Sequence, residues 1–316
     1  METAIPASET AVDFPGLLRF WRTRRGYSQL ALSLAAGVSQ RHISFLESGR
    51  ARPSREMILA LADCLNVPLR QRNRLLLAAG FAPVFSEHQL DEPPLQMVQQ
   101  AVRLILDKQE PYPAVVLDRF WNLIDANRAY RRMLAALLGE DHPAAAHGID
   151  GDDEDANEIG GRLLTPSRPP GLNLMLAVFD PDGLWPTLEN AEQVGRYLLR
   201  RVWQELQGQA HERAAREIFT RIARWHPDMV RDGVPLVDAM ADGIAEAGLP
   251  PVLPVAVRRG PFRVAMFSTL TTLGNPHDIT LQEMRIECFF PADEASRRVF
   301  EDLATKDRPA RMAAAG

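Results

Sequence analysis

The stretch GVSQRHISFLESGRARPS, residues 37–54, is rich in side chains that can form hydrogen bonds in pairs. Gln40 and Arg41 are adjacent there, and an amide and a guanidinium are suited to bidentate contacts with adenine and guanine in the major groove of DNA. Arg50 and Arg52 follow, and such arginines bind backbone phosphates, which positions a protein without reading sequence. The residues with suitable groups are Ser39, Gln40, Arg41, His42, Ser44, Arg50 and Arg52. The alternative is a protein-binding module whose arginines are only solvated.

These side chains need rigid elements to hold them, and the flanking sequence predicts two short helices around a tight turn. Gly37 can adopt the positive φ that such a turn requires, and Ser28 and Ser39 can cap the two helices. The apolar positions have helix-turn-helix spacing; they are Leu32, Ala36, Val38, Ile43 and Leu46. Over residues 14–80 we expect five short helices, at about 14–25, 29–36, 40–48, 54–65 and 69–79.

The charge of the chain is divided unevenly. Residues 14–80 hold 11 arginines and 3 acidic residues, whereas the whole chain has a net charge of -5. A basic segment joined to an acidic remainder is expected of a nucleic-acid-binding module that carries a partner domain. The chain start lacks the features of a signal peptide, and no run of about 18 apolar residues predicts a membrane span. Because Cys64 and Cys288 are the two cysteines and lie far apart, we expect a reduced, cytoplasmic protein.

The segment SQLALSLAAGVSQRHISFLESGRARPS, residues 28–54, closely resembles the Cro/repressor-like (XRE) helix-turn-helix family. The resemblance implies that the helix after Ser39 lies in the major groove of double-stranded DNA. It implies that Gln29 contacts a phosphate, for which a helix N-terminus is suited. It also implies an ion pair between Arg22 and Glu47 that ties the first helix to the third.

Two residues of this segment depart from the family pattern. Ser33 stands where alanine is usual, and a small residue still lets the helices approach. Phe45 stands where a polar residue is commoner. We expect Phe45 either to pack against a neighbouring helix or dimer partner, or to contact a thymine methyl group.

A loop with a proline pair divides the chain after residue 81. We expect a flexible N-terminus at 1–13, a DNA-binding domain at 14–81, a linker at 82–93, a ligand-binding domain at 94–305 and a flexible tail at 306–316. In the second domain the pattern predicts helices at 97–109, directly after residue 127, and at 185–207, 212–225 and 293–304. It predicts strands at 113–118, 122–127, on either side of 259–261, and at 281–290. This order indicates an α+β fold, an antiparallel sheet with helices packed on it. The acidic stretch 139–171 is predicted to be a mobile loop.

The stretch YPAVVLDRFWNLIDANRAY, residues 112–130, is similar to the start of a PAS-like sensor domain, and the order of the whole chain resembles the MmyB-like regulators. The resemblance implies a second domain that holds a small hydrophobic ligand, expected to be a fatty acid. Large apolar side chains between sheet and helices either line such a pocket or fill a packed core. Those singled out are Tyr130, Met175, Phe179, Trp185, Trp203, Phe219, Trp225, Met266 and Phe267. The unranked partners for a ligand carboxylate are Arg196, Arg200, Arg258, Arg263 and Tyr130.

The sequence therefore predicts a ligand-responsive transcription regulator, expected to be a homodimer because headpieces of this type read two half-sites. Nucleophile-elbow, zinc-protease, P-loop and dinucleotide signatures were not found, so we expect no catalytic residue, no metal and no required cofactor. The aspartates at 150–155 lack the glycine of an EF-hand loop, and His142 and His147 have no further ligands at metal spacing. Two alternatives stay open: an enzyme carried on a DNA-binding headpiece, and a protein-binding adaptor.

Overall fold

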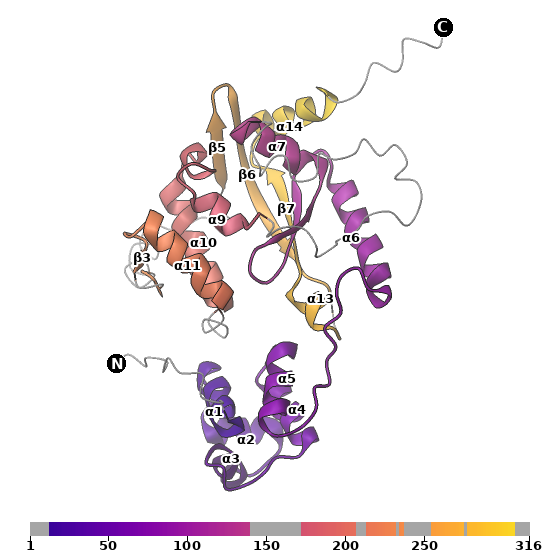
Figure 1. Cartoon of the computed structure of the whole chain (residues 1–316), viewed down its shortest axis with the longest axis vertical. Helices are drawn as coiled ribbons and strands as arrows, with labels where there is room; N and C mark the ends of the chain where they lie inside the picture. The colour runs from indigo at the N-terminus through magenta and orange to yellow at the C-terminus, as the bar shows by residue number, and fades with distance from the viewer. Residues whose placement is uncertain are drawn as a thin grey trace. The chain divides into compact units, whose positions relative to one another are not determined.

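The computed structural model describes residues 13–139, 172–206, 213–231, 234–236, 254–274 and 277–306 (Figure 1). These residues form two compact units. One comprises the described part of Met1–His88 together with Gly274–Gln282, and the other comprises the described parts of Gln89–Leu273 and Glu283–Gly316. Residues 140–171 of the predicted acidic loop lie outside the described residues, and with them its aspartates and its two histidines. The chain ends at 1–12 and 307–316 also lie outside them.

Five helices make up the N-terminal part of the first unit, which confirms the prediction. They are α1 (Phe14–Arg24), α2 (Gln29–Ala36), α3 (Gln40–Glu47), α4 (Arg55–Cys64) and α5 (Leu69–Ala78). Serine side chains cap three of them: Ser28, Ser39 and Ser54 each accept a hydrogen bond from the backbone N–H three residues later. Asp13 caps α1 in the same way through the N–H of Gly16. Local sequence signals therefore mark where these four helices begin.

The turn between α2 and α3 depends on Gly37. Its φ is 66°, a left-handed conformation that side chains with a Cβ rarely adopt. The turn lets the apolar faces of α2 and α3 meet α1, α4 and α5 in one core. The most deeply buried side chains of this core include Leu18, Leu32, Ile43, Leu46, Ile58, Leu61, Leu65 and Leu76.

The segment that follows α5 also belongs to the first unit. The Asn73 side chain accepts hydrogen bonds from the N–H groups of Val84 and Phe85 and donates one to the Phe85 carbonyl. Asp278, distant in sequence, accepts hydrogen bonds from the N–H and the Nδ1 of His88, at 3.1 and 2.8 Å. Residues 82–88, the predicted start of a linker, are thus held by specific contacts.

The second unit is built on a five-stranded antiparallel sheet in the order β2-β1-β7-β6-β5. The strands are β1 (Ala114–Leu117), β2 (Leu123–Ala126), β5 (Val255–Arg259), β6 (Phe262–Thr271) and β7 (Arg285–Pro291). Gly260, with a φ of 56°, makes the tight turn between β5 and β6. Chain-distant strands meet at the centre, where Ala114 of β1 pairs with Cys288 of β7.

Helices pack on this sheet, so the α+β class is confirmed. They are α6 (Gln96–Gln109), α7 (Arg128–Leu138), α9 (Leu174–Phe179), α10 (Ala191–Leu206), α11 (Arg213–Trp225) and α14 (Glu294–Lys306). A further short helix, α13 (Ile279–Glu283), lies almost entirely in the first unit. Figure 1 shows α9, α10 and α11 grouped on one side of the sheet. Two short 3₁₀ helices, η1 (Pro93–Leu95) and η2 (Trp185–Thr187), and a small hairpin of β3 (Val230–Arg231) and β4 (Val234–Pro235) complete the described elements.

Two predicted boundaries are wrong. The helix expected from Trp185 begins at Ala191, because the segment before it is held by the sheet: the N–H of Glu189 donates to the Ala256 carbonyl at 2.8 Å. The strand expected from Leu281 begins at Arg285, because Asp278 accepts a hydrogen bond from the N–H of Thr280 at 2.9 Å and caps α13. The short helix α9 and the β3–β4 hairpin were not anticipated.

Candidate functional site

Helix α3 presents two different faces. Ile43, Leu46 and Glu47 point into the core of the first unit. Gln40 and Arg41 are exposed, and His42 and Ser44 are partly exposed. A short helix with its polar donors on one side and its apolar anchors on the other can enter a groove without losing its own packing.

The guanidinium of Arg41 lies over the ring of Phe45, with its central carbon 5.1 Å from the ring centroid. Phe45 is partly buried and stands one helical turn further along α3. A guanidinium held over the face of an aromatic ring keeps its outward-pointing N–H groups free to form paired hydrogen bonds. Phe45 therefore restricts the conformations of the residue that is best suited to contact guanine.

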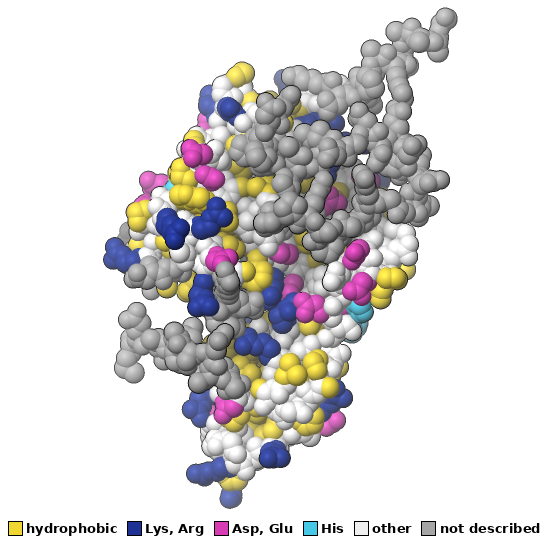
Figure 2. Space-filling model, in the orientation of Figure 1, with side chains coloured by type: hydrophobic (Ala, Val, Ile, Leu, Met, Phe, Trp, Pro, Cys, Tyr) yellow, Lys and Arg dark blue, Asp and Glu magenta, His cyan; other side chains and the backbone are white. Residues whose placement is uncertain are grey.

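The arginines after α3 lie in a turn tied to that helix. The backbone N–H groups of Arg50 and Ala51 both donate to the Phe45 carbonyl, at 2.9 and 3.2 Å. Arg50 and Arg52 are exposed. Figure 2 shows basic side chains gathered at the end of the headpiece that carries α3 in Figure 1. Cations at this position can bind phosphates while α3 faces the bases.

Beneath the exposed face, Glu47 collects several hydrogen bonds. Arg22 of α1 donates through Nε to Oε1 at 2.6 Å and through Nη2 to Oε2 at 3.0 Å. Gln29 of α2 donates to Oε2 at 2.8 Å, and Arg19 donates to the Glu47 carbonyl at 2.9 Å. Burial alone would raise the pKa of Glu47, but the hydrogen bonds from Arg22 and Gln29 and the nearby positive charges leave its pKa below the ordinary value. One carboxylate thus joins the first three helices.

Gln29 has a different partner here from the phosphate expected of it. Its side-chain amide is oriented by Glu47, one of the residues that the resemblance had paired with Arg22. The side chain is partly exposed at the N-terminus of α2. The same contact that holds Gln29 to Glu47 therefore also fixes where its amide group lies on the headpiece surface.

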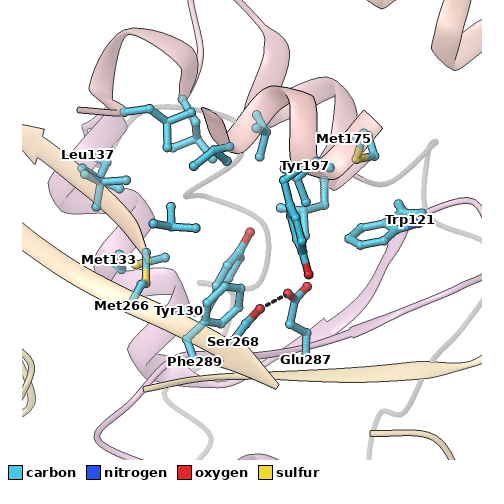
Figure 3. Close-up of a pocket in the computed structure, with 18 of the residues that line it drawn as sticks. Trp121, Tyr130, Met133, Leu137, Met175, Tyr197, Met266, Ser268, Glu287 and Phe289 are labelled. Atoms are coloured by element: carbon cyan, nitrogen blue, oxygen red, sulfur yellow. Dashed lines mark hydrogen bonds between the residues drawn. The ribbon is translucent and has the colours of Figure 1, made fainter. Parts of the chain in front are cut away.

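The second unit contains a cavity of about 190 Å³ between the sheet and helices α7, α9 and α10 (Figure 3). Engineered apolar cavities of about 150 Å³ bind benzene, so this space is large enough for part of an apolar molecule. Most of the lining is aliphatic or aromatic. The lining residues are Trp121, Tyr130, Met133, Leu137, Leu174, Met175, Val178, Leu184, Leu188, Val194, Tyr197, Leu198, Arg201, Val255, Val257, Met266, Ser268, Glu287 and Phe289.

Polar groups gather at one end of this cavity. Ser268 of β6 donates a hydrogen bond to Glu287 of β7 at 2.5 Å, and Figure 3 shows the Tyr197 hydroxyl directed toward the same carboxylate. The Tyr130 hydroxyl and the Trp121 indole nitrogen are buried and have no hydrogen-bond partner within the described residues. Burial, and secondarily the charge of Glu287, raise the pKa of Tyr130 well above its ordinary value. Tyr130 is therefore a neutral donor and acceptor.

The predicted ligand-binding residues divide into two groups. Tyr130, Met175 and Met266 line the cavity. The others pack against one another elsewhere: Phe179 stacks on Trp185 with centroids 5.4 Å apart, and Trp203 meets Phe219 edge-on at 5.3 Å. Outside those pairs, Phe267 stacks on Phe290, and Trp225 lies under Arg221.

Several lining residues are not among those predicted from the sequence, including Trp121, Tyr197, Arg201, Ser268 and Glu287. One signal was available. Residues 266 and 268 of β6, and 287 and 289 of β7, alternate along their strands and so share a face. Of the arginines proposed to meet a carboxylate, Arg258 and Arg263 instead pair with Glu189.

The described part of the chain contains no cluster of three or more metal-ligating side chains, and none of its helices is both long and apolar enough to cross a membrane. Both cysteines are free thiols, and burial raises the pKa of Cys288.

Comparison with known proteins gives two family matches, and no curated protein matches the chain. A helix-turn-helix family model matches residues 18–71, which contain the exposed face of α3. The model of the MmyB-like transcription regulator ligand binding domain matches residues 98–147 and 134–303, more than half of the chain and all of the cavity lining. The resemblance inferred from the sequence is confirmed: the chain belongs to the MmyB-like transcription regulators, with an N-terminal helix-turn-helix and a C-terminal ligand-binding domain.

Proposed function

We propose that this regulator senses an apolar small molecule in the cavity of its second unit, and that a fatty acid is the first ligand to test. The observation that supports this is the cavity itself, which is lined mostly by apolar side chains and has polar groups at one end. Each buried CH₂ group contributes about 0.8 kcal/mol, so a chain of moderate length can offset the cost of its immobilisation.

On the DNA side, we propose that Gln40 and Arg41 contact the bases and that Ser39 and Ser44 contact bases or phosphates. The proposed backbone contacts are Gln29, His42, Arg50 and Arg52. The domain bounds remain those predicted, 14–81 for DNA binding and 94–305 for the ligand. We propose a homodimer, because a helix-turn-helix of this type reads paired half-sites one helical turn apart. We also propose that the protein acts in the cytoplasm and has no catalytic activity.

A ligand can regulate DNA binding only if it prefers one state of the protein over another. The full-length protein should therefore be stripped of bound lipid, and its preferred DNA selected from a random pool. Fatty acids of graded chain length should then be titrated, with uptake measured by calorimetry and DNA affinity measured in parallel. Saturable uptake with an optimum chain length and an accompanying change in DNA affinity is expected. The proposal fails if no fatty acid or related amphiphile binds saturably.

An adaptor that has lost its affinity for DNA gives a different result. Phosphate contacts release counterions, so DNA binding weakens steeply as salt increases. If the protein showed no measurable affinity for any DNA at low salt, the adaptor alternative would replace the regulator.

A further inference from the structure

The polar end of the cavity contains a buried carboxylate. Glu287 lies at the centre of the sheet, on β7 between β1 and β6, and is only 4% exposed. It accepts a hydrogen bond from Ser268 at 2.5 Å, and its carboxylate points into the cavity in Figure 3. A carboxylate accepts hydrogen bonds and donates none, and its two oxygens have about four acceptor sites. The carboxylate therefore favours a ligand group that donates a hydrogen bond.

Two buried groups near this carboxylate are suited to a ligand that also accepts a hydrogen bond. Tyr130 is 2% exposed and Trp121 is 1% exposed, and neither the Tyr130 hydroxyl nor the Trp121 indole N–H has a partner within the described residues. Figure 3 shows the Tyr130 hydroxyl directed into the cavity. A buried polar group without a hydrogen bond is costly, and a ligand that supplies the missing partner removes this cost.

An ionic head group of either sign would meet a like charge in the cavity lining. A ligand carboxylate beside Glu287 would place two negative charges together, which is tolerated only if the two groups share a proton. Arg201 also lines the cavity, with its guanidinium carbon 5.3 Å from the Trp121 ring centroid, and it would repel an ammonium group. An ammonium group also cannot accept a hydrogen bond from the indole of Trp121.

We propose that the polar head of the ligand is an uncharged hydroxyl that donates a hydrogen bond to Glu287 and accepts one from Tyr130 or Trp121. This inference rests on the proposed function, because it concerns the same cavity. Two kinds of amphiphile carry such a hydroxyl: a long-chain alcohol, and a fatty acid in its protonated form. Glu287 acts here as the residue that selects the head group, and the apolar lining accepts the chain.

The test compares decanol, decanoate and decyl methyl ether, which share one apolar chain. Calorimetric titration of the full-length protein should be carried out at about pH 8, where a carboxylic acid in water is ionised. Decanol is expected to bind about tenfold or more tightly than either of the others, because decanoate brings a charge and the ether has no donor. This comparison uses the unaltered protein and does not depend on any variant folding.

The role of Glu287 is tested by Glu287→Gln, which keeps the shape of the side chain and removes its charge. We expect decanoate to bind this variant at least about tenfold more tightly than it binds the wild type, so that the preference for decanol narrows. Glu294→Gln, on the exposed face of α14, is the matched control and should leave the preference unchanged.

Three results would count against the inference. Equal or tighter binding of decanoate by the wild type would show that Arg201, not Glu287, selects the head group. Equal affinities for the ether and decanol would show that the ligand hydroxyl donates no hydrogen bond to the protein. If the Glu287→Gln variant folded and kept the same preference for decanol over decanoate, Glu287 would not select the head group. If none of the three compounds bound saturably, and graded fatty acids did not bind either, the proposed function itself would be wrong.

Discussion

Arg22 and Glu47 form a bidentate ion pair that joins the first helix to the one proposed to contact DNA. Both guanidinium–carboxylate contacts are at most 3.0 Å, and the side chains are 14% and 1% exposed. Two parallel hydrogen bonds fix the relative orientation of the two groups as well as their separation. The position of α3 therefore depends on a buried charge as well as on apolar packing.

Replacing Glu47 with alanine should strongly destabilise the headpiece. The change leaves the Arg22 guanidinium largely buried without its carboxylate, and breaking a buried pair costs about 3–5 kcal/mol. Hydrogen exchange of the α1 and α3 amides in the full-length protein, measured by mass spectrometry at increasing denaturant, reports this loss. Glu56→Ala, at an exposed position on α4, is the control and should cost little stability. Equal protection in the Glu47 variant and the wild type would mean that the pair contributes no stability.

The same pair should make the headpiece sensitive to acid. The folded-state pKa of Glu47 is lowered, so its contribution to stability is complete above the ordinary glutamate pKa and is lost as pH falls through the lower folded value. Amide protection of α1 and α3 should therefore decline as pH decreases from about 5 toward 3. In Glu47→Gln the amide protection should decline less with falling pH than in the wild type, whereas in Glu56→Gln it should decline almost as much as in the wild type. If the Glu47→Gln profile matched the wild type, other carboxylates would be responsible for the acid sensitivity.

Two arginines near α3 should affect DNA binding in different ways. Arg41→Ala removes a side chain proposed to contact a base, and should cost roughly 1–3 kcal/mol at the preferred site and relax its sequence preference. Arg50→Ala removes a proposed phosphate contact, and should weaken binding to all DNA similarly and reduce the salt slope by about 1. Titrations on preferred and scrambled DNA at several salt concentrations distinguish the two effects. If Arg41→Ala bound both DNAs less well by the same factor, Arg41 would be a backbone contact.

A larger side chain in the cavity should prevent ligand uptake. Met266 is 3% exposed and points into the cavity, so Met266→Trp fills space that an apolar chain would occupy. Saturable uptake should be lost while folding, followed by thermal unfolding, is retained. Met97→Trp is the matched control, because Met97 on α6 is 80% exposed. Undiminished uptake by the folded Met266 variant would place the binding site elsewhere.

The headpiece could be predicted from its sequence because its signals are local. A serine before each of three helices and a glycine after α2 define element ends without reference to the rest of the chain. The second unit contains fewer such signals. The sequence predicts a helix from Trp185, whereas the residues just after η2 are held by backbone contacts to β5. Those contacts form between residues about seventy positions apart, and no local pattern contains them.

The cavity was harder to predict for a related reason. Apolar periodicity identifies side chains that are buried but does not say whether they meet other side chains or an empty space. Met175 and Phe179 are both buried and lie on the same short helix, yet Met175 lines the cavity and Phe179 stacks on Trp185. Glu287 shows a further difficulty, because its alternation with Phe289 places both residues on one face of β7 but does not indicate that this face borders a cavity.

The first unit is discontinuous in the chain, and this affects how the protein can be divided. The backbone passes between the two units at 88–89, 273–274 and 282–283. The side chain of Gln282 accepts a hydrogen bond from the N–H of Leu69 at 2.7 Å, at the otherwise uncapped start of α5. The hydroxyl of Thr280 donates a hydrogen bond to the His88 carbonyl at 2.6 Å. A fragment that ends at residue 81 would lose these contacts. A single proteolytic cut near residue 89 would leave residues 1–88 attached to the rest of the chain only through noncovalent contacts with residues 274–282, such as those made by Thr280 and Gln282.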